Sequence, residues 1–237
     1  MTPAVLALSD VVKTYGALRP LRIQALVVRG GDTVALLGFD SPMAEVFVNI
    51  VTGATLPDSG EVQAFGRPTA AVSDSADWLA LVDRFGIVSA RAVLLGELSV
   101  IQNLSMPFTL DIEPPADDIR ARAEALAGEA GLPEASWPRP VSELGAVDRA
   151  RLRVARALAH DPGVLLLEHA SAEIPPRDVR LIALEIRRLA EARRVAIVAV
   201  TADEDFAGVV AARILSLEPA SGRLRERRQG WLARVLG

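Results

Sequence analysis

The alternation of short apolar runs with helix-like segments is the feature that most constrains this sequence. The run from Thr33 to Leu37 is almost entirely apolar and stops at Gly38, which suits a strand buried on both faces. Two similar runs, Val164–Leu167 and Val195–Val200, follow later, and residues at helical spacing follow each of them. Strands that alternate with helices need crossover connections, so the sequence predicts an α/β fold with a mostly parallel sheet.

The remaining segments extend this pattern. Runs rich in Val, Leu and Ile between Gly and Pro residues predict further strands over 5–12, 21–28, 61–65, 85–88 and 213–217. Apolar residues at helical spacing predict helices over 42–52, 117–130, 148–160, 178–192 and 206–211. The middle third of the chain is therefore expected to form a helical subdomain.

Composition excludes several classes of function. The formal charge is −4, whereas a general nucleic-acid binder needs a surplus of Lys and Arg. The chain has no cysteine, which rules out disulfides and thiolate metal sites. Its apolar stretches fall far short of the ~20 residues of a membrane span, and the N-terminus lacks the pattern of a secretory signal. Any work at a membrane is expected to go through partners.

The order and spacing of several segments resemble the nucleotide-binding domain of ATP-binding cassette (ABC) transporters, from Val5 to about Leu224. Gly31–Gly38 is similar to the strand that enters the family's Walker A loop, and Leu56–Val62 to its next turn and strand. Leu98–Leu104 resembles the segment after the Q-loop, especially in the lipoprotein-release and macrolide-exporter subgroup. Arg151–Pro162 is similar to the helix after the signature motif.

This resemblance implies a P-loop NTPase-like cassette with a mostly parallel core sheet, an N-terminal antiparallel β subdomain and a helical subdomain. The whole chain, 1–237, would be one such domain. Residues 1–89 and 161–222 would form the α/β core with the β subdomain. Residues from about 90 to 160 would form the helical subdomain, and 223–237 a basic C-terminal tail.

Residues 38–45 take the place of the family's phosphate-binding loop, but most of the groups such a loop needs are missing. A working loop brings glycine backbone close to phosphate, a Lys to the outer phosphates and a Ser or Thr to Mg²⁺. After Gly38, the Lys position is Ala44 and the Mg²⁺ hydroxyl position is Glu45. Lys13 is the only lysine of the chain and no Arg lies in the loop, so no local replacement for the cation is expected.

Asp40 and Glu45 would also place negative charge where a triphosphate docks. The sequence favours an empty helix end, with Ser41 as N-cap, Pro42 at the first helical position and Glu45 in the first turns. These residues are interpreted as the vestige of a nucleotide site.

Positions that the resemblance assigns to catalysis are changed as well. The family's Walker B strand ends in Asp, for Mg²⁺, and then Glu, for the attacking water; here these are Glu168 and His169. A lone histidine at that point is more often a hydrogen-bonded structural residue than a base. Alanine or proline stands at three further positions where the family contacts nucleotide or Mg²⁺: Ala90 (Q-loop), Ala202 (switch His) and Pro175 (D-loop). The signature motif, here Gly145 to Asp148, has lost residues that let its backbone approach the γ-phosphate closely. Tyr15, where the family stacks an aromatic residue on adenine, is kept.

The favoured reading is a catalytically inactive cassette with no cofactor. It would be cytoplasmic, at the inner face of the cell membrane, and would act as structural or regulatory partner of permease subunits and of a second cassette. One alternative is an ATP- and Mg²⁺-binding subunit with weak hydrolysis, in which Glu45 and Glu168 hold the metal and His169 is the base. Another is a binding module that uses the basic C-terminal tail, with Trp231 on a helical apolar face.

Overall fold

The three apolar runs form adjacent strands at the centre of a six-stranded sheet in the computed structural model, which describes residues 2–227. These strands are β3 (Thr33–Leu37), β8 (Ala196–Val200) and β7 (Val164–Glu168). The sheet has the order β10-β9-β3-β8-β7-β6, and its outer strands are β6 (Phe85–Ser89), β9 (Arg213–Glu218) and β10 (Arg223–Glu226). All pairs are parallel except β10–β9, which confirms the predicted mostly parallel core.

Successive residues of the central strands enter two different hydrophobic cores. In β3, Val34 and Leu36 face one core, whereas Ala35 and Leu37 face the other. The same alternation separates Leu165 and Leu167 from Leu166 in β7. Because neither face of the sheet meets water, these strands contain almost no polar residue.

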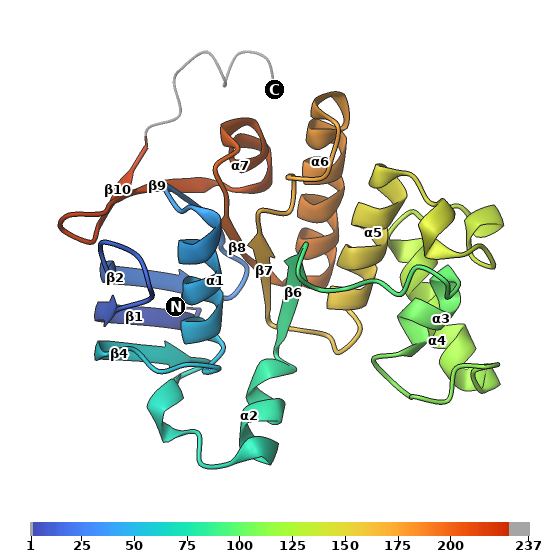
Figure 1. Ribbon diagram of the computed structural model, residues 1–237, viewed down its shortest axis with the longest axis horizontal. Coiled ribbons are helices and arrows are strands. Elements are labelled where there is room, and N and C mark those ends of the chain that lie inside the picture. Colours follow the sequence, from blue (N-terminus) through green and yellow to red (C-terminus); the bar gives the residue numbers. More distant parts are fainter. Residues whose placement is uncertain (1, 228–237) are drawn as a thin grey trace.

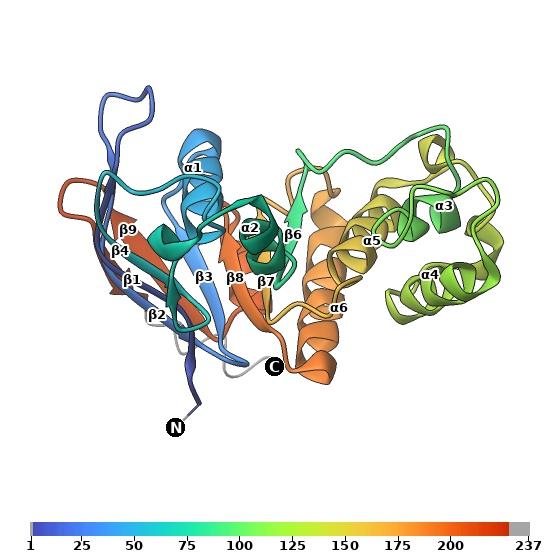
Figure 2. The same cartoon turned by 90° about the horizontal axis from the view of Figure 1, so that it is seen from below.

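The first core lies between the two sheets, with α1 (Ser41–Val51) between them (Figures 1 and 2). The smaller sheet is antiparallel, in the order β2-β1-β4-β5, as the sequence predicts for the N-terminal part. Its strands are β1 (Ala4–Lys13), β2 (Leu21–Arg29), β4 (Ser59–Ala64) and β5 (Arg67–Pro68). Helix α1 buries Phe47, Val48 and Ile50 in this core, which fixes where the loop before it is presented.

The second core is covered by helices from the later part of the chain. They are α5 (Ala146–Ala157), α6 (Pro176–Arg193) and α7 (Glu204–Val210). Helix α5 lies with α3 (Val100–Ser105) and α4 (Asp117–Glu129) at the end of the molecule opposite the antiparallel sheet (Figure 1). Helix α3 begins with a capping box between Ser99 and Gln102. The exact subdomain boundaries given above stay a prediction.

Several elements differ from the sequence prediction, which contained neither α3 nor the two-residue strand β5. Helix α2 (Ser75–Val82), capped by Asp74, was not predicted, because its eight residues are too few for a clear helical period. Arg223–Glu226 was assigned to the basic tail, but these residues form β10 and pair with β9. The exposed charged side chains of Arg223, Arg225 and Glu226 suit an edge strand. The rest of the predicted tail, including Trp231, lies outside the described residues.

Three short 3-10 helices complete the described elements: Thr69–Ala71, Glu134–Ser136 and Val141–Glu143.

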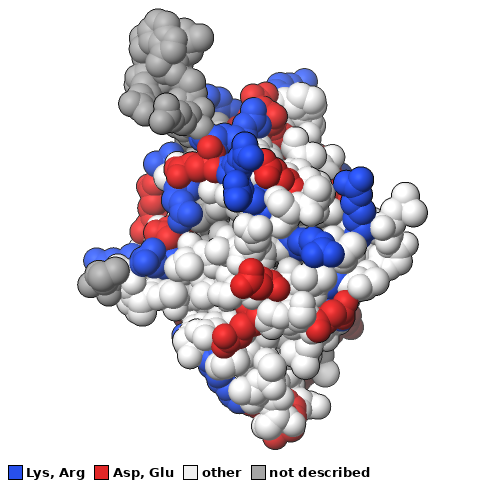
Figure 3. All heavy atoms as spheres, turned by 90° about the vertical axis from the view of Figure 1, so that its left-hand side faces the viewer, with Lys and Arg blue, Asp and Glu red and all other residues white. Residues whose placement is uncertain are grey.

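Charges of both signs are mixed on the surface. On the face seen in Figure 3, Lys and Arg alternate with Asp and Glu and form no field of one sign. Ion pairs account for part of this mixing: Arg225 of β10 pairs with Glu218 of β9, and Arg227 with Glu204 at 2.7 Å. Within residues 2–227, no helix is long and apolar enough to cross a membrane.

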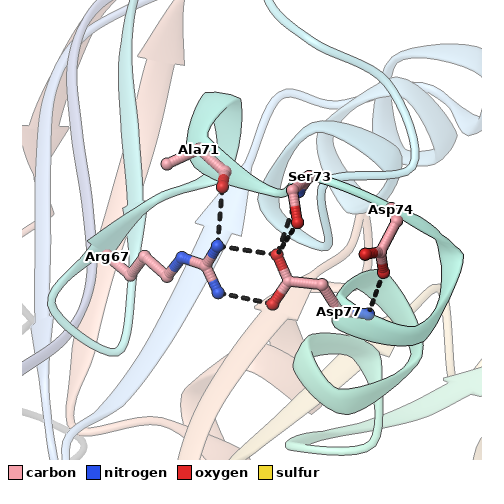
Figure 4. A network of polar contacts seen from close by, with 5 residues as sticks. All are labelled: Arg67, Ala71, Ser73, Asp74 and Asp77. Atoms are coloured by element: carbon pink, nitrogen blue, oxygen red, sulfur yellow. Dashed lines mark hydrogen bonds and ion pairs between the residues drawn. The ribbon is translucent and has the colours of Figure 1, made fainter.

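An arginine–aspartate network holds the turn between β5 and α2 (Figure 4). Arg67 donates two hydrogen bonds to the Asp77 carboxylate, at 2.5 and 2.6 Å, and one to the Ala71 carbonyl at 2.6 Å. The backbone N–H of Ser73 donates to the same carboxylate at 2.9 Å. These bonds, from Arg67 first and Ser73 second, lower the pKa of Asp77 to about 2.

We expect Asp77 to make stability depend on pH in the acid range. Because its pKa is about 2 in the folded protein and 3.8 as an ordinary value, its contribution is complete above about pH 4 and is lost as the pH falls to about 2. Urea unfolding between pH 5 and 2 should therefore show a flatter pH dependence for Asp77→Asn and for Arg67→Met than for the wild type. Equal slopes in all three proteins would contradict this assignment.

Close packing of β6 against α5 gives a second prediction. A Cβ added to Gly86 would overlap the carbonyl oxygen of Ala157 and come within 2.8 Å of Leu165. Gly86→Ala should thus lower the free energy of unfolding by at least about 2 kcal/mol. The matched control is Gly208→Ala in α7, where a Cβ would meet nothing within 4 Å; it should stabilise by roughly 0.5–1 kcal/mol. Urea denaturation of both variants tests the difference, and similar effects would be inconsistent with it.

Candidate functional site

The loop between β3 and α1 is closed by its own side chains. Gly38 has φ +89°, which a residue with a side chain rarely adopts. Phe39 follows and is 2% exposed, with its ring edge-on to Phe47 of α1 at a centroid distance of 5.8 Å. The residue after the glycine is thus an anchor in the hydrophobic core.

Asp40 caps helix α1. Its carboxylate accepts a hydrogen bond from the N–H of Met43 at 2.8 Å, and its carbonyl accepts from Ala44 at 2.9 Å. The prediction that Ser41 is the N-cap is therefore wrong by one residue, because Asp40 has the extended backbone of a cap and Ser41 is already helical. The donor that a phosphate would use at this helix end is bonded to a carboxylate of the same chain.

Ala44 and Glu45 follow near the start of α1. Ala44 is fully buried in the core between the sheets, so the position at which the family places its lysine now contributes to packing. The side chain of Glu45 is 47% exposed and turns toward the end of β7.

A carboxylate ends the neighbouring strand β7. Glu168 is its last residue and is 5% exposed. Burial makes an isolated carboxylate unfavourable unless a cation or several hydrogen bonds compensate its charge. The partner of Glu168 therefore decides what this site can do.

That partner is Arg91. Its Nε and one terminal nitrogen donate to the two Glu168 oxygens at 2.9 and 2.6 Å. The other terminal nitrogen lies 3.0 Å from Glu45 Oε1. One guanidinium thus joins the two carboxylates that the resemblance places at the family's Mg²⁺-binding positions, and its planar fork matches a two-point contact.

Strand pairing places Arg91 at this point. Ser89 ends β6 and stands in register with Glu168 on the adjacent parallel strand. The Ser89 hydroxyl accepts a hydrogen bond from the Arg91 N–H at 3.1 Å, and a turn closes when Ala92 N–H donates to the Ser89 carbonyl. Hydrogen bonds with Glu168 raise the pKa of Arg91 most, against an opposing effect of burial, and the charges of Glu168 and Glu45 add to the rise.

The sequence analysis missed Arg91. It looked for a replacement cation only within the 38–45 loop, where none lies, whereas the structure places a cation from the segment after β6 between Glu45 and Glu168. A signal existed in the sequence. Arg91 directly follows Ala90, the position that the resemblance assigns to the Q-loop glutamine. The resemblance also places two acids, Glu45 and Glu168, at the metal-binding positions, and two such carboxylates need a nearby cation.

His169, the residue at the general-base position, has a backbone in the left-handed region, with φ +45°. Its N–H donates to the Val200 carbonyl at 2.9 Å, and its carbonyl accepts from Ala172 at 3.0 Å. Ring atom Nε2 is buried and has no hydrogen-bond partner among the described residues. His169 lines a small cavity together with residues of α5 and α6.

The other predicted positions hold no group that reaches Glu168. Ala90 is exposed beside Arg91, and Ala202 lies after β8. Ala202 and His169 line an open groove of about 690 Å³ between α6 and α7. Pro175 precedes α6 and serves as its N-terminal boundary.

Residues of the signature position lie at the start of α5, in the helical part. Gly145 is the N-cap of α5 and makes no side-chain cap bond. Asp148 is engaged by Arg151 at 3.0 Å, and Arg151 also pairs with Glu185 of α6 at 2.7 Å. Asp148 is thus part of a network between two helices.

Tyr15 follows β1 and packs against the core between the sheets. Burial raises the pKa of Tyr15, and the negative charge of Asp40 raises it further. Tyr15 is therefore close to the capped end of α1, where a nucleotide would also meet the Asp40 carboxylate.

These contacts do not fit ATP with Mg²⁺. Glu45 and Glu168, the two metal candidates of the sequence analysis, both bind Arg91. Among residues 2–227 no group of three or more His, Cys, Asp or Glu side chains is arranged to hold a metal ion. With Asp40 on the helix end and Ala44 in the core, the loop offers no cation to the outer phosphates.

Removing Arg91 should turn the carboxylate pair into a divalent-cation site. Arg91→Ala leaves Glu168 buried without a cation, so we expect a loss of about 1–2 kcal/mol, reduced from the value of a fully buried pair because Arg91 is 43% exposed. Millimolar Mn²⁺ should then recover part of the stability, measured as the melting temperature, in this variant and not in the wild type.

The control is Arg91→Ala with Glu168→Gln. It lacks the cation and one of the two carboxylates, so Mn²⁺ should have little effect on its melting temperature. An equal Mn²⁺ effect on the wild type would show that Arg91 does not occupy the metal position.

Comparison with known proteins identifies relatives along nearly the whole chain, although no family model matches it. The lipoprotein-releasing system ATP-binding protein LolD of Xanthomonas axonopodis pv. citri is 30% identical over 227 residues, covering 94% of this chain and 91% of the relative. The nopaline permease ATP-binding protein P of Agrobacterium fabrum is 28% identical over 236 residues, covering 95% and 90%.

Solved structures share the fold. A dimeric ATP-binding cassette bound to ADP and Pi has a TM-score of 0.76 at 23% identity and covers 95% of this chain and 99% of its own. A Clostridium perfringens protein described as part of the ABC transporter complex cbiONQ has a TM-score of 0.77 at 20% identity, covering 94% and 87%. These likenesses confirm the predicted cassette fold. On the strength of its sequence relatives, the chain belongs to the ATP-binding cassette family of ABC transporter subunits.

Proposed function

We propose that this chain is a non-hydrolysing cassette that serves as a structural or regulatory partner of membrane permease subunits. The observation that carries the proposal is the Arg91 guanidinium between Glu45 and Glu168. A metal ion and this guanidinium cannot occupy the same position between the two carboxylates. The guanidinium of Arg91 would therefore neutralise these carboxylates permanently, because unlike a metal ion it cannot dissociate from the protein.

The charge around the loop supports this proposal. Asp40, Glu45 and Glu168 bring three negative charges, and Arg91 brings one positive charge. Lys13, the only lysine of the chain, pairs with Asp58 at 3.1 Å and is thus already engaged. An incoming triphosphate would meet a net negative site.

The alternative of a weak ATPase has less support. It needs Glu45 and Glu168 on a metal and His169 as base, but Arg91 holds both carboxylates and the Nε2 atom of His169 is buried. A base must come within hydrogen-bond reach of the water that it activates. The Arg91 contacts therefore favour the inactive cassette over this alternative.

Partners and location follow from the family and stay part of the proposal. Relatives are described as ATP-binding proteins of a permease and of a lipoprotein-releasing system. We infer that this chain likewise attaches to permease subunits at the inner face of the cell membrane, with a second cassette as a further partner. Since both its Walker and its signature positions have changed, it would not complete a nucleotide site for that cassette.

Titration of the purified chain with ATP·Mg²⁺ tests the proposal. We expect no heat of binding up to millimolar nucleotide in isothermal titration calorimetry and no release of phosphate. The reason is that the loop has neither a lysine for the phosphates nor a site for Mg²⁺. An intact cassette such as LolD is the positive control. Micromolar binding with turnover would overturn the proposal; loss of that turnover in Glu168→Ala with His169→Ala would then establish the alternative.

The permease contact needs a separate measurement. Tagged protein purified from detergent-solubilised membranes of its native host should carry a permease subunit with it, and Arg91→Ala should weaken this association if Arg91 orders the segment after β6. Recovery of the chain alone from both the membrane and the soluble fraction would argue against a role at a permease.

A further inference from the structure

A small cavity of about 10 Å³ lies between the end of β7 and helices α5 and α6, apart from the Arg91 contacts. Four polar side chains line it: Ser89 from β6, Arg153 from α5, and His169 and Glu173 from the segment between β7 and α6. The remaining lining includes Val88, Val154 and Ile186, which are buried and apolar. The cavity is thus a polar pocket inside an otherwise hydrophobic contact.

Two of these side chains each present a buried atom without a partner. Arg153 Nε and His169 Nε2 are buried and have no hydrogen bond within residues 2–227. Such atoms are nearly always hydrogen-bonded in folded proteins, to protein or to ordered water. Here one atom is a donor and the other is an acceptor when the imidazole is neutral and protonated on Nδ1.

We propose that one structural water molecule binds in this cavity and bridges Arg153 Nε to His169 Nε2. The volume is about that of the single probe sphere that a buried water needs. The water would accept a hydrogen bond from Arg153 Nε–H and donate one to His169 Nε2. Ser89 supplies a third partner, because its oxygen accepts from the Arg91 N–H and its own proton can point to the water.

The charges around the cavity select water over an ion. The Arg153 guanidinium repels a cation. Its terminal nitrogen pairs with Glu173 at 2.7 Å, so the pair has no net positive charge to attract an anion. An anion the size of chloride also needs more room than the cavity gives. A neutral molecule that both accepts and donates is the remaining match.

This water fixes the chemistry of His169. When Nε2 accepts the bridge, the ring proton stays on Nδ1, so neither ring nitrogen is free to act as a base toward the loop before α1. The bridge also joins the helical part, through α5, to the ends of β6 and β7. His169 therefore positions α5 on the core sheet.

The tautomer of His169 is the first test. The chain has two histidines, so His160→Gln leaves His169 alone in a long-range ¹H–¹⁵N spectrum, recorded at about pH 8.5 where an ordinary imidazole is neutral. We expect the unprotonated nitrogen to be Nε2, which couples to both ring C–H protons. In the same background Arg153→Met should change the shift of this nitrogen, while Arg156→Met, on the same helix but outside the cavity lining, should leave it unchanged.

A high-resolution crystal structure of the full chain is the second test. We expect one density peak within about 2.7–3.2 Å of both Arg153 Nε and His169 Nε2. The peak should disappear in His169→Phe, which keeps an aromatic side chain and removes the acceptor. A ring protonated on Nε2, a direct contact between the two side chains or a cavity without density would each overturn the proposal.

Discussion

A buried carboxylate must be compensated, and this requirement at Glu168 organises the whole candidate site. Glu168 ends the fully buried strand β7, where water cannot solvate its charge. The bidentate contact from Arg91 supplies the compensation, and the third nitrogen of the same guanidinium reaches Glu45 on α1. Three segments that are distant in sequence therefore meet at one cation.

A tethered cation differs from a bound metal in one physical respect. A metal ion and its nucleotide leave the protein by dissociation, and the carboxylates then separate or bind protons. Arg91 is part of the chain and remains charged at all physiological pH values. The geometry between β6, β7 and α1 is thus held by a side chain of the protein itself, as the proposed structural role requires.

Local sequence rules accounted for most of the fold, whereas the changed positions at the site were predicted only from the resemblance to the family. The continuous apolar runs predicted β3, β7 and β8, and helical spacing predicted α1, α4, α5, α6 and α7 to within a few residues. Helices α2 and α3 were missed because eight and six residues give too weak a period, and β10 because its arginines were interpreted as part of a basic tail. Helix α2 and strand β10 depend on contacts with neighbours, Arg67 for α2 and β9 for β10.

The sequence by itself determined the side chains at the positions that the resemblance assigns to nucleotide contacts: Ala44 has no amine, Ala90 has no amide and Ala202 has no imidazole. Only the tertiary structure decided what replaced them. Arg91 is 46 residues from Glu45 and 77 from Glu168, and no periodicity relates these positions. Parallel pairing of β6 with β7 brings Arg91 to Glu168, and the packing of α1 between the sheets brings Glu45 to the same point. The orientation of His169 has the same origin, since its left-handed backbone and its cavity are set by the strand end and by α5.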